Sequence, residues 1–302
     1  MNHFNLTKAR QIYSEGKNVT EFLREEFQEK DNTSEIIEIA YDLQAGSYID
    51  LVNANYQRAN IYANELAGLL EPHLLNQSSL LDVGTGELTT LSLLLNNLQT
   101  QMSQIFAFDI SWSRLYKGKD FFNKNCNSKS VILNPFVADI KQIPLCSKSV
   151  DIVTSSHALE PNGRKLSILL NEIFRVTKNK CILFEPSYEL NSEEGKRRME
   201  RLGYIKDVEG TVKSLGGRVL DVQLIKNVGN TLNPTACFVI EPPKLVSEVD
   251  HNKPRFSVPG TDFLLNREGQ FFTSLDTGLL FPVLHDIPIL KSEAGILGTA
   301  LF

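Results

Sequence analysis

Two glycines that follow a short apolar run are the residues of this sequence best suited to hold a ligand. The run covers residues 80–83, and Gly84-Thr85-Gly86 comes directly after it. Glycines let the backbone approach a ligand closely and adopt conformations that other residues avoid. A turn of this kind is typical of nucleotide-binding sites, although it can also be purely structural.

The residues around this turn distinguish between two nucleotide cofactors. A dinucleotide-binding turn has a third glycine for close helix packing, and its pyrophosphate lies at the N-terminus of the next helix. Leu88 or Thr89 occupies the third position here, and the acid Asp82 lies two residues before the first glycine. A carboxylate at that place would repel pyrophosphate but would suit a cationic amino group. We therefore expect S-adenosylmethionine rather than NAD as the cofactor.

Further acids follow the next apolar runs. Asp109 ends the run 104–109, where an acid can accept hydrogen bonds from ribose hydroxyls. Asp139 follows the run 131–137 and could accept a hydrogen bond from the exocyclic amine of adenine. Both could instead be solvated acids at strand ends. The candidate cofactor-binding residues of these segments are Asp82, Gly84, Thr85, Gly86, Asp109, Ile110, Asp139, Ile140 and Ser155.

Catalytic residues are harder to identify from the sequence. Transfer of a methyl group from a sulfonium depends mainly on proximity and alignment, and it needs a base only when the nucleophile carries a proton of high pKa. His157, just after the run 150–155, is the best candidate base by position and by type. Glu160 and Glu185 come next, and the segment 185–189 could line an acceptor pocket. Each of these residues could instead have a structural role.

The elements that must position these residues alternate along the chain. Residues 1–75 carry apolar side chains at helical spacing, and Pro72 should end their last helix. From 79 to 241, short apolar runs alternate with helical stretches, including one at 89–97, as in a mostly parallel sheet covered on both faces. The last two runs, 219–225 and 236–240, have no helix between them and should pair antiparallel. After a polar, proline-containing linker at 242–254, β-like runs follow at 263–265, 270–273, 279–281 and 287–290.

The composition is that of an ordinary globular protein, because 42% of the 302 residues are hydrophobic and 22% are charged. The net charge is -5, whereas a free-standing nucleic-acid-binding protein usually carries an excess of positive charge. The cysteines 126, 146, 181 and 237 form no C-x-x-C pair, so we expect reduced thiols, no zinc site and a cytoplasmic location. The sequence shows no apolar signal core and no run of about 18 apolar residues that would span a membrane.

Four motifs in order resemble class I methyltransferases of the ubiquinone- and menaquinone-biosynthesis type. They are the segments 81–86, 109–111 and 143–153, and Asp139. The resemblance implies a Rossmann-like α/β fold with a seven-stranded, mostly parallel sheet. It also implies that the glycine turn holds the methionine end of S-adenosylmethionine, that Asp109 binds ribose and that Asp139 contacts adenine. The segment 41–48 is similar to one that folds over the cofactor in relatives, so Tyr48 or Gln44 could touch the cofactor's carboxylate, unless Tyr48 is a packing residue.

The C-terminal segment 278–290 resembles the closing part of a small zinc-ribbon protein, a partner of several tRNA and protein methyltransferases. The two C-x-x-C pairs of that ribbon would fall at 258–261 and 274–277, where none of the four positions is cysteine. A four-ligand zinc site needs thiolates or imidazoles at those points. We therefore expect a metal-free module that serves as a lid, as a dimerisation surface or as a stabilising element.

Together these features predict an S-adenosylmethionine-dependent methyltransferase with a helical cap at 1–75, a core at 76–243 and a small β-rich module at 244–302. Its acceptor would be a small metabolite or biosynthetic intermediate, because the cap closes one side of the pocket and the acidic charge disfavours a long polyanion. Two alternatives stay open. One is methylation of tRNA or a protein, which the module suggests, and the other is a non-catalytic subunit or regulator that binds the cofactor. We expect no membrane partner, and the module could join two copies into a homo-oligomer.

Overall fold

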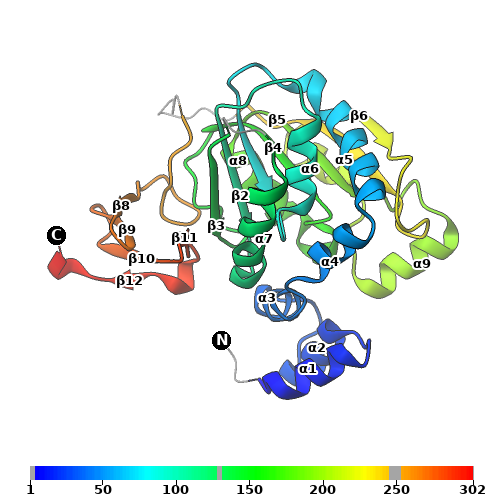
Figure 1. The fold of residues 1–302 in the computed structure, drawn as a ribbon, viewed down its shortest axis with the longest axis horizontal. Coiled ribbons are helices and arrows are strands. Elements are labelled where there is room, and N and C mark those ends of the chain that lie inside the picture. The colour runs from blue at the N-terminus through cyan, green and yellow to red at the C-terminus, as the bar shows by residue number, and fades with distance from the viewer. Residues whose placement is uncertain (1–3, 128–130, 245–252, 302) are drawn as a thin grey trace.

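The computed structural model describes residues 4–127, 131–244 and 253–301, and a seven-stranded sheet lies at its centre (Figure 1). The strands are β1 Ser79–Val83, β2 Gln104–Asp109, β3 Leu133–Val137, β4 Val150–Ser156, β5 Thr177–Pro186, β6 Arg218–Leu224 and β7 Thr235–Glu241. Their order is β3-β2-β1-β4-β5-β7-β6. β7 runs antiparallel to both β5 and β6, and β1 to β5 pair in parallel. The predicted fold class is confirmed, including the antiparallel final pair.

The central strands are apolar because both faces of the sheet are covered. β1 is buried along its whole length, with Leu80 facing one side and Leu81 and Val83 the other. The first side packs on α5 (Tyr56–Leu70), α6 (Thr89–Asn97) and α7 (Trp112–Asn125). The second side packs on α8 (Leu166–Val176) and α10 (Val208–Ser214). No helix of the described residues is both long and apolar enough to cross a bilayer.

The helical cap consists of α1 (Leu6–Ser14), α2 (Val19–Phe27), α3 (Ser34–Leu43) and α4 (Ser47–Ala54), which lead into α5. As Pro72 predicts, α5 ends at Leu70 and a short 3-10 turn, Glu71–His73, follows. α2 and α3 enclose a small apolar core of their own around Leu23 and Ile36. Asp42 on α3 then accepts hydrogen bonds from the hydroxyls of Ser111 (2.7 Å) and Ser113 (3.0 Å) at the start of α7. The cap is thereby anchored beside the carboxyl end of β2.

The C-terminal module is β-rich, as predicted, and forms a small antiparallel sheet. It contains β8 Asn266–Glu268, β9 Phe271–Ser274, β10 Leu279–Leu284, β11 Ile287–Pro288 and β12 Ile296–Leu297. The expected strand at 263–265 was wrong. Those residues form a short loop that pairs with 256–258, and the run is apolar because Leu265 is buried in the main core. Most of the predicted linker, residues 245–252, lies outside the described residues.

The module covers the edge of the sheet at β3, beside which it lies in Figure 1. The Leu290 N–H donates to the Val137 carbonyl at 2.8 Å, and the Phe256 ring packs edge-on against Phe136 at 5.2 Å between ring centroids. Covering an edge strand removes unpaired backbone groups that would otherwise invite association. Lys291 also forms an ion pair with Glu38 on α3, with 2.6 Å between Nζ and Oε2. The module therefore binds both the sheet and the cap.

Candidate cofactor and acceptor site

The glycine turn joins β1 to α6 at the carboxyl edge of the sheet. Gly84 and Gly86 adopt φ values of +63° and +59°, in the left-handed region. A Cβ on Gly84 would come within 2.4 Å of the Ala158 Cβ, and a Cβ on Gly86 within 2.7 Å of Arg114 Nη2. The backbone conformation therefore favours glycine at both positions, and the Ala158 Cβ also leaves no space for a side chain at Gly84.

Leu88, one of the two candidate positions for a third glycine, keeps a glycine-like conformation with φ of +56°. This conformation costs a leucine about 1–2 kcal/mol. The side chain is completely buried in the cluster that joins α5 to α6, which offsets the strain. The departure from glycine thus changes the packing of the turn but not its shape.

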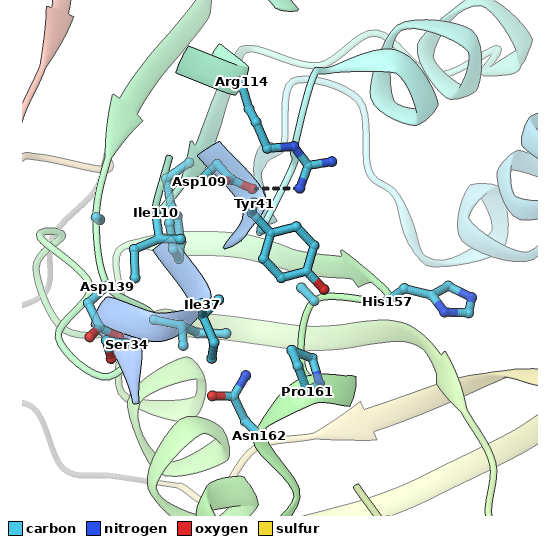
Figure 2. A pocket seen from close by; sticks show the side chains of 15 residues that line it. Ser34, Ile37, Tyr41, Asp109, Ile110, Arg114, Asp139, His157, Pro161 and Asn162 are labelled. Atoms are coloured by element: carbon cyan, nitrogen blue, oxygen red, sulfur yellow. Dashed lines mark ion pairs between the residues drawn. The ribbon is translucent and has the colours of Figure 1, made fainter. Parts of the chain in front are cut away.

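A small cavity of about 80 Å³ lies beyond the ends of β2, β3 and β4 (Figure 2). Five of the predicted cofactor residues line it, namely Gly84, Asp109, Ile110, Asp139 and Ile140. α3 adds Ser34, Ile37 and Tyr41 to its walls. Figure 2 shows the Tyr41 ring in the middle of this site, between Arg114 and Pro161. The small cavity therefore combines apolar walls with acids at strand ends.

Asp109 also shapes the glycine turn itself. Its Oδ2 accepts a hydrogen bond from the Gly86 N–H and its Oδ1 from the Ser111 N–H, both at 2.9 Å. Arg114 Nη1 lies 4.0 Å from Oδ2, as the dashed line in Figure 2 marks. Each carboxylate oxygen can accept a further hydrogen bond. Asp109 is thus a structural acceptor of the turn as well as a wall of the small cavity.

A large cavity of about 630 Å³ lies on the other side of Tyr41, Gly84, Arg114 and His157, which line both cavities. Its walls come from α4, α5 and the glycine turn, and from the β6–β7 connection at residues 227–235. Thr85, Gly86 and Tyr48 are the other predicted cofactor residues that line it. This volume is typical of sites that enclose a small molecule.

Asp82 lines a third, narrower cavity of about 40 Å³ beneath the turn, together with Thr85 and Ser156. Burial raises the pKa of Asp82 to about 7. A cationic amino group close to this carboxyl would favour its ionised form. The position therefore suits the chemistry that the sequence predicts for it.

Three predicted site residues, Gln44, Ser155 and Glu185, line none of these cavities. Gln44 ends α3, and Tyr41, one helical turn earlier, faces the cavities instead. The Ser155 hydroxyl donates to Glu185 at 2.8 Å, whereas Ser156 lines the large cavity. Neighbouring strand residues point to opposite faces, so an error of one position selects the wrong serine.

Glu185 holds the loop after β4 rather than lining an acceptor pocket. Its Oε1 accepts hydrogen bonds from the N–H groups of Ala158 (3.0 Å) and Leu159 (3.1 Å) as well as from Ser155. The carboxyl is buried, and burial raises its pKa to about 7. Glu185 therefore positions the loop that carries His157, which corrects its expected place in the acceptor pocket.

His157 and Glu160 form a hydrogen-bonded pair at the boundary between the two cavities. His157 Nδ1 lies 2.7 Å from Glu160 Oε2, and its Nε2 lies 2.8 Å from the Thr235 hydroxyl. Burial lowers the pKa of His157, but the hydrogen bond and negative charge of Glu160 outweigh it, so the pKa is raised. His157 also has φ of +56°, a strained conformation that often marks functional positions.

Arg114 is the main feature of the site that sequence reasoning missed. Its guanidinium lies between the rings of Tyr41 and Tyr48, 5.1 and 4.7 Å from their centroids. It also approaches Glu87, with 3.7 Å between Nε and Oε1. Glu87 in turn accepts hydrogen bonds from the N–H groups of Gly46 and Ile49, both at 2.9 Å. A buried arginine is unusual, but the sequence alone did not show that Arg114 would be buried.

A family model matches the part of the chain that contains β2 to β4 and most of β1 and β5. Residues 81–184 match the model of a family described as a methyltransferase domain. No curated protein matches the chain. The match to this family confirms the predicted methyltransferase domain and, with it, the predicted cofactor S-adenosylmethionine.

Two solved structures share the fold at low sequence identity. One is a complex between the Haloferax volcanii Trm112 methyltransferase activator and a protein assigned as a methyltransferase, at 15% identity, with 67% of this chain and 97% of that chain covered and a TM-score of 0.51. The other is magnesium protoporphyrin IX methyltransferase (ChlM) from Synechocystis PCC 6803 with bound SAH, at 10% identity, 69% and 99% coverage and a TM-score of 0.51. At these identities the likeness shows a common fold and leaves the acceptor open.

Proposed function

We propose that this chain, which carries an S-adenosylmethionine-dependent methyltransferase domain, methylates a hydroxyl group of a small molecule bound in the large cavity. The observation that carries the proposal is the His157–Glu160 pair, because it lies where the two cavities meet and its imidazole is 32% exposed. A general base at this place is useful only if the acceptor loses a proton of high pKa.

The residues of the small cavity fit the adenosine part of the cofactor. Ile110 and Ile140 supply apolar walls, and Asp109 and Asp139 supply acceptors for hydroxyl and amino groups. The glycine turn and the buried carboxyl of Asp82 would hold the methionine part. When bound, S-adenosylmethionine supplies an electrophilic methyl group on a sulfonium. The large cavity shares Gly84, Arg114 and His157 with the small one, so it would hold the acceptor.

His157 would accept the proton of the acceptor hydroxyl through Nε2. With Nδ1–H donating to Glu160, Nε2 carries the lone pair, and the Thr235 hydroxyl now lies against it. An acceptor hydroxyl would take the place of that of Thr235. The raised pKa makes His157 a stronger base, and Glu160 stabilises the imidazolium that forms.

The walls of the large cavity favour a small acceptor over tRNA or a protein. α4, α5 and the 227–235 segment surround it, and a volume of about 630 Å³ holds a small molecule. The His157–Glu160 pair argues against the alternative of a subunit that only binds the cofactor. No described residue of the C-terminal module lines this cavity, so the module gives no support to a macromolecular acceptor.

We also propose that the C-terminal module is a built-in stabilising partner of the methyltransferase domain. It binds the edge of β3 and, through Lys291, the helix α3 that carries Tyr41. The Haloferax volcanii structure contains an activator and its methyltransferase as a complex. Here a single chain would supply both parts.

Transfer of a labelled methyl group tests the proposed function. The full chain is incubated with methyl-labelled S-adenosylmethionine and a metabolite extract, and separately with RNA and protein from the same cells. We expect label in the small-molecule fraction, and a rate about 10²–10⁴-fold lower for His157→Gln with unchanged binding of S-adenosylhomocysteine. Label confined to RNA or protein, or full activity of the variant, would contradict the proposal.

A further inference from the structure

The charges in the large cavity do not balance. The described residues that line it include three arginines and two carboxylates, Glu87 and Glu160, with His157 neutral as the base. One of the arginines, Arg114, lies close to Glu87, with 3.7 Å between Nε and Oε1. Two others, Arg58 and Arg198, also line the cavity, and neither lies in an ion pair with a carboxylate of the described residues. The protein therefore presents uncompensated positive charge to whatever occupies this space.

Arg198 is the more constrained of the two guanidinium groups. It lies on α9 (Glu193–Leu202), beside the Tyr204 ring at 5.7 Å from its centroid. Its Nη1 is buried and has no hydrogen-bond partner. A buried donor without a partner destabilises the protein, more so when it is charged, so a ligand that accepts a hydrogen bond from it would bind more tightly. The wide fork of a guanidinium matches a planar pair of anionic oxygens.

A second unpaired group lies on the same wall. Asn233 donates from Nδ2 to Glu160 at 3.3 Å, and its Oδ1 is buried without a partner. An acceptor oxygen at this place calls for a hydroxyl or N–H group on the ligand. Tyr204 lies near both Arg198 and Glu160, because its ring is 5.7 Å from the Arg198 guanidinium, and burial together with the negative charge of Glu160 raises the pKa of its hydroxyl. Arg198, which could bind an anion, and Asn233, which could bind a hydroxyl, therefore lie next to the His157–Glu160 pair.

We propose that the methyl acceptor is a hydroxylated carboxylic acid, with its carboxylate on Arg198 and a hydroxyl near Asn233 and His157. This inference rests on the proposed function and names its substrate class. A carboxylate fits better than a phosphate dianion, because one guanidinium compensates one charge and Glu160 lies close by. Arg198 is then a specificity-determining residue, while His157 acts on the reacting hydroxyl.

Binding of matched acid and amide probes tests this inference without turnover. Glucuronate, quinate and 3-hydroxybenzoate, each with its primary amide, and glucose 6-phosphate are titrated into the full chain loaded with S-adenosylhomocysteine. Ligand-observed NMR measures the affinities. We expect at least one acid to bind at least about tenfold more tightly than its amide, since a charge-assisted hydrogen bond is lost in the amide.

Three variants test whether the preference for the acid depends on Arg198 itself or only on the net positive charge of the protein. Arg198→Gln should abolish the preference for the acid, and Arg198→Lys, which keeps the charge, should retain part of it. Arg197→Gln removes the same charge from the exposed neighbour on α9 and should leave the preference intact. All three should bind S-adenosylhomocysteine as the wild type does, which also shows that they are folded.

Several outcomes would overturn the inference. These are equal binding of acids and amides, absence of binding by all three acids, tighter binding of glucose 6-phosphate than of any acid, or a preference that survives Arg198→Gln. Loss of S-adenosylhomocysteine affinity in folded Arg198→Gln would assign the arginine to the cofactor instead. If an acid binds through Arg198 but the transfer assay labels no small molecule, the proposed function is refuted, and Arg198 keeps its role as a carboxylate-binding residue while the acid is not a methyl acceptor.

Discussion

The small and the large cavity meet at His157, yet they are built from different kinds of structure. The small cavity takes Asp109, Ile110 and Asp139 from the carboxyl ends of β2 and β3. The large cavity takes Arg198 from α9 and Asn233 from the β6–β7 connection, which are distant from the glycine turn in sequence. The first kind of wall follows from local structure, and the second depends on how distant segments pack. The difference explains why the cofactor could be predicted and the acceptor could not.

We expect the largest effect from a variant that loosens α3, because this helix lines mainly the small cavity. Lys291→Ala leaves the carboxylate of Glu38, 17% exposed, without its partner from the module. We expect a loss of about 3 kcal/mol in the free energy of unfolding, measured in urea, together with weaker binding of S-adenosylhomocysteine. The reason is that α3 carries Ser34, Ile37 and Tyr41.

A double variant is the control for this ion pair. Lys291→Met combined with Glu38→Leu removes both charges and fills similar volume, so it should recover most of the lost stability. A single variant as stable as the wild type would show that the module does not hold the cap.

The next effect concerns the loop that both cavities share. Glu185→Ala removes the acceptor of two buried N–H groups and the Ser155 hydroxyl, and we expect a loss of about 2 kcal/mol by thermal or urea unfolding. Glu185→Gln keeps an acceptor oxygen there and should lose much less. If the two variants are equally stable, the loop does not depend on these hydrogen bonds.

The smallest expected effect is the pH dependence of the base. Only neutral His157 can accept a proton, and its pKa is raised, so kcat/KM should rise with pH around a midpoint above 6.5. Glu160→Gln removes the charge that raises this pKa, so the midpoint should move to lower pH and the weaker base should lower the rate. If the midpoint of the pH profile is unchanged in Glu160→Gln, Glu160 does not raise the pKa of His157.

The sequence predicted what local patterns determine. The glycine turn, the bounds of α6, and the acids Asp109 and Asp139 at the strand ends all follow from apolar runs and their spacing. It did not reveal that β7 lies between β5 and β6, because strand order depends on long-range pairing. It chose Ser155 over Ser156 because the strand was expected to end one residue early.

Side chains whose role depends on tertiary packing could not be predicted from the sequence. Arg198 and Arg197 are neighbours of the same type, and only the packing of α9 buries Nη1 of the first and exposes the second. Tyr41 and Gln44 differ in the same way, since the hydrogen bonds of Asp42 to α7 decide which face of α3 meets the cavity. Positions such as these need the folded chain before their chemistry can be recognised.

Calorimetric titration with S-adenosylhomocysteine tests the central claim most directly, namely that the cofactor lies on the glycine turn and extends into the small cavity while the acceptor lies in the large one. We expect the wild type to bind, Asp109→Ala to bind more weakly by about 1–3 kcal/mol, and Arg198→Gln to bind as the wild type does. NAD should not bind. Tight binding of NAD without S-adenosylhomocysteine binding, or unchanged affinity in Asp109→Ala, would contradict the account.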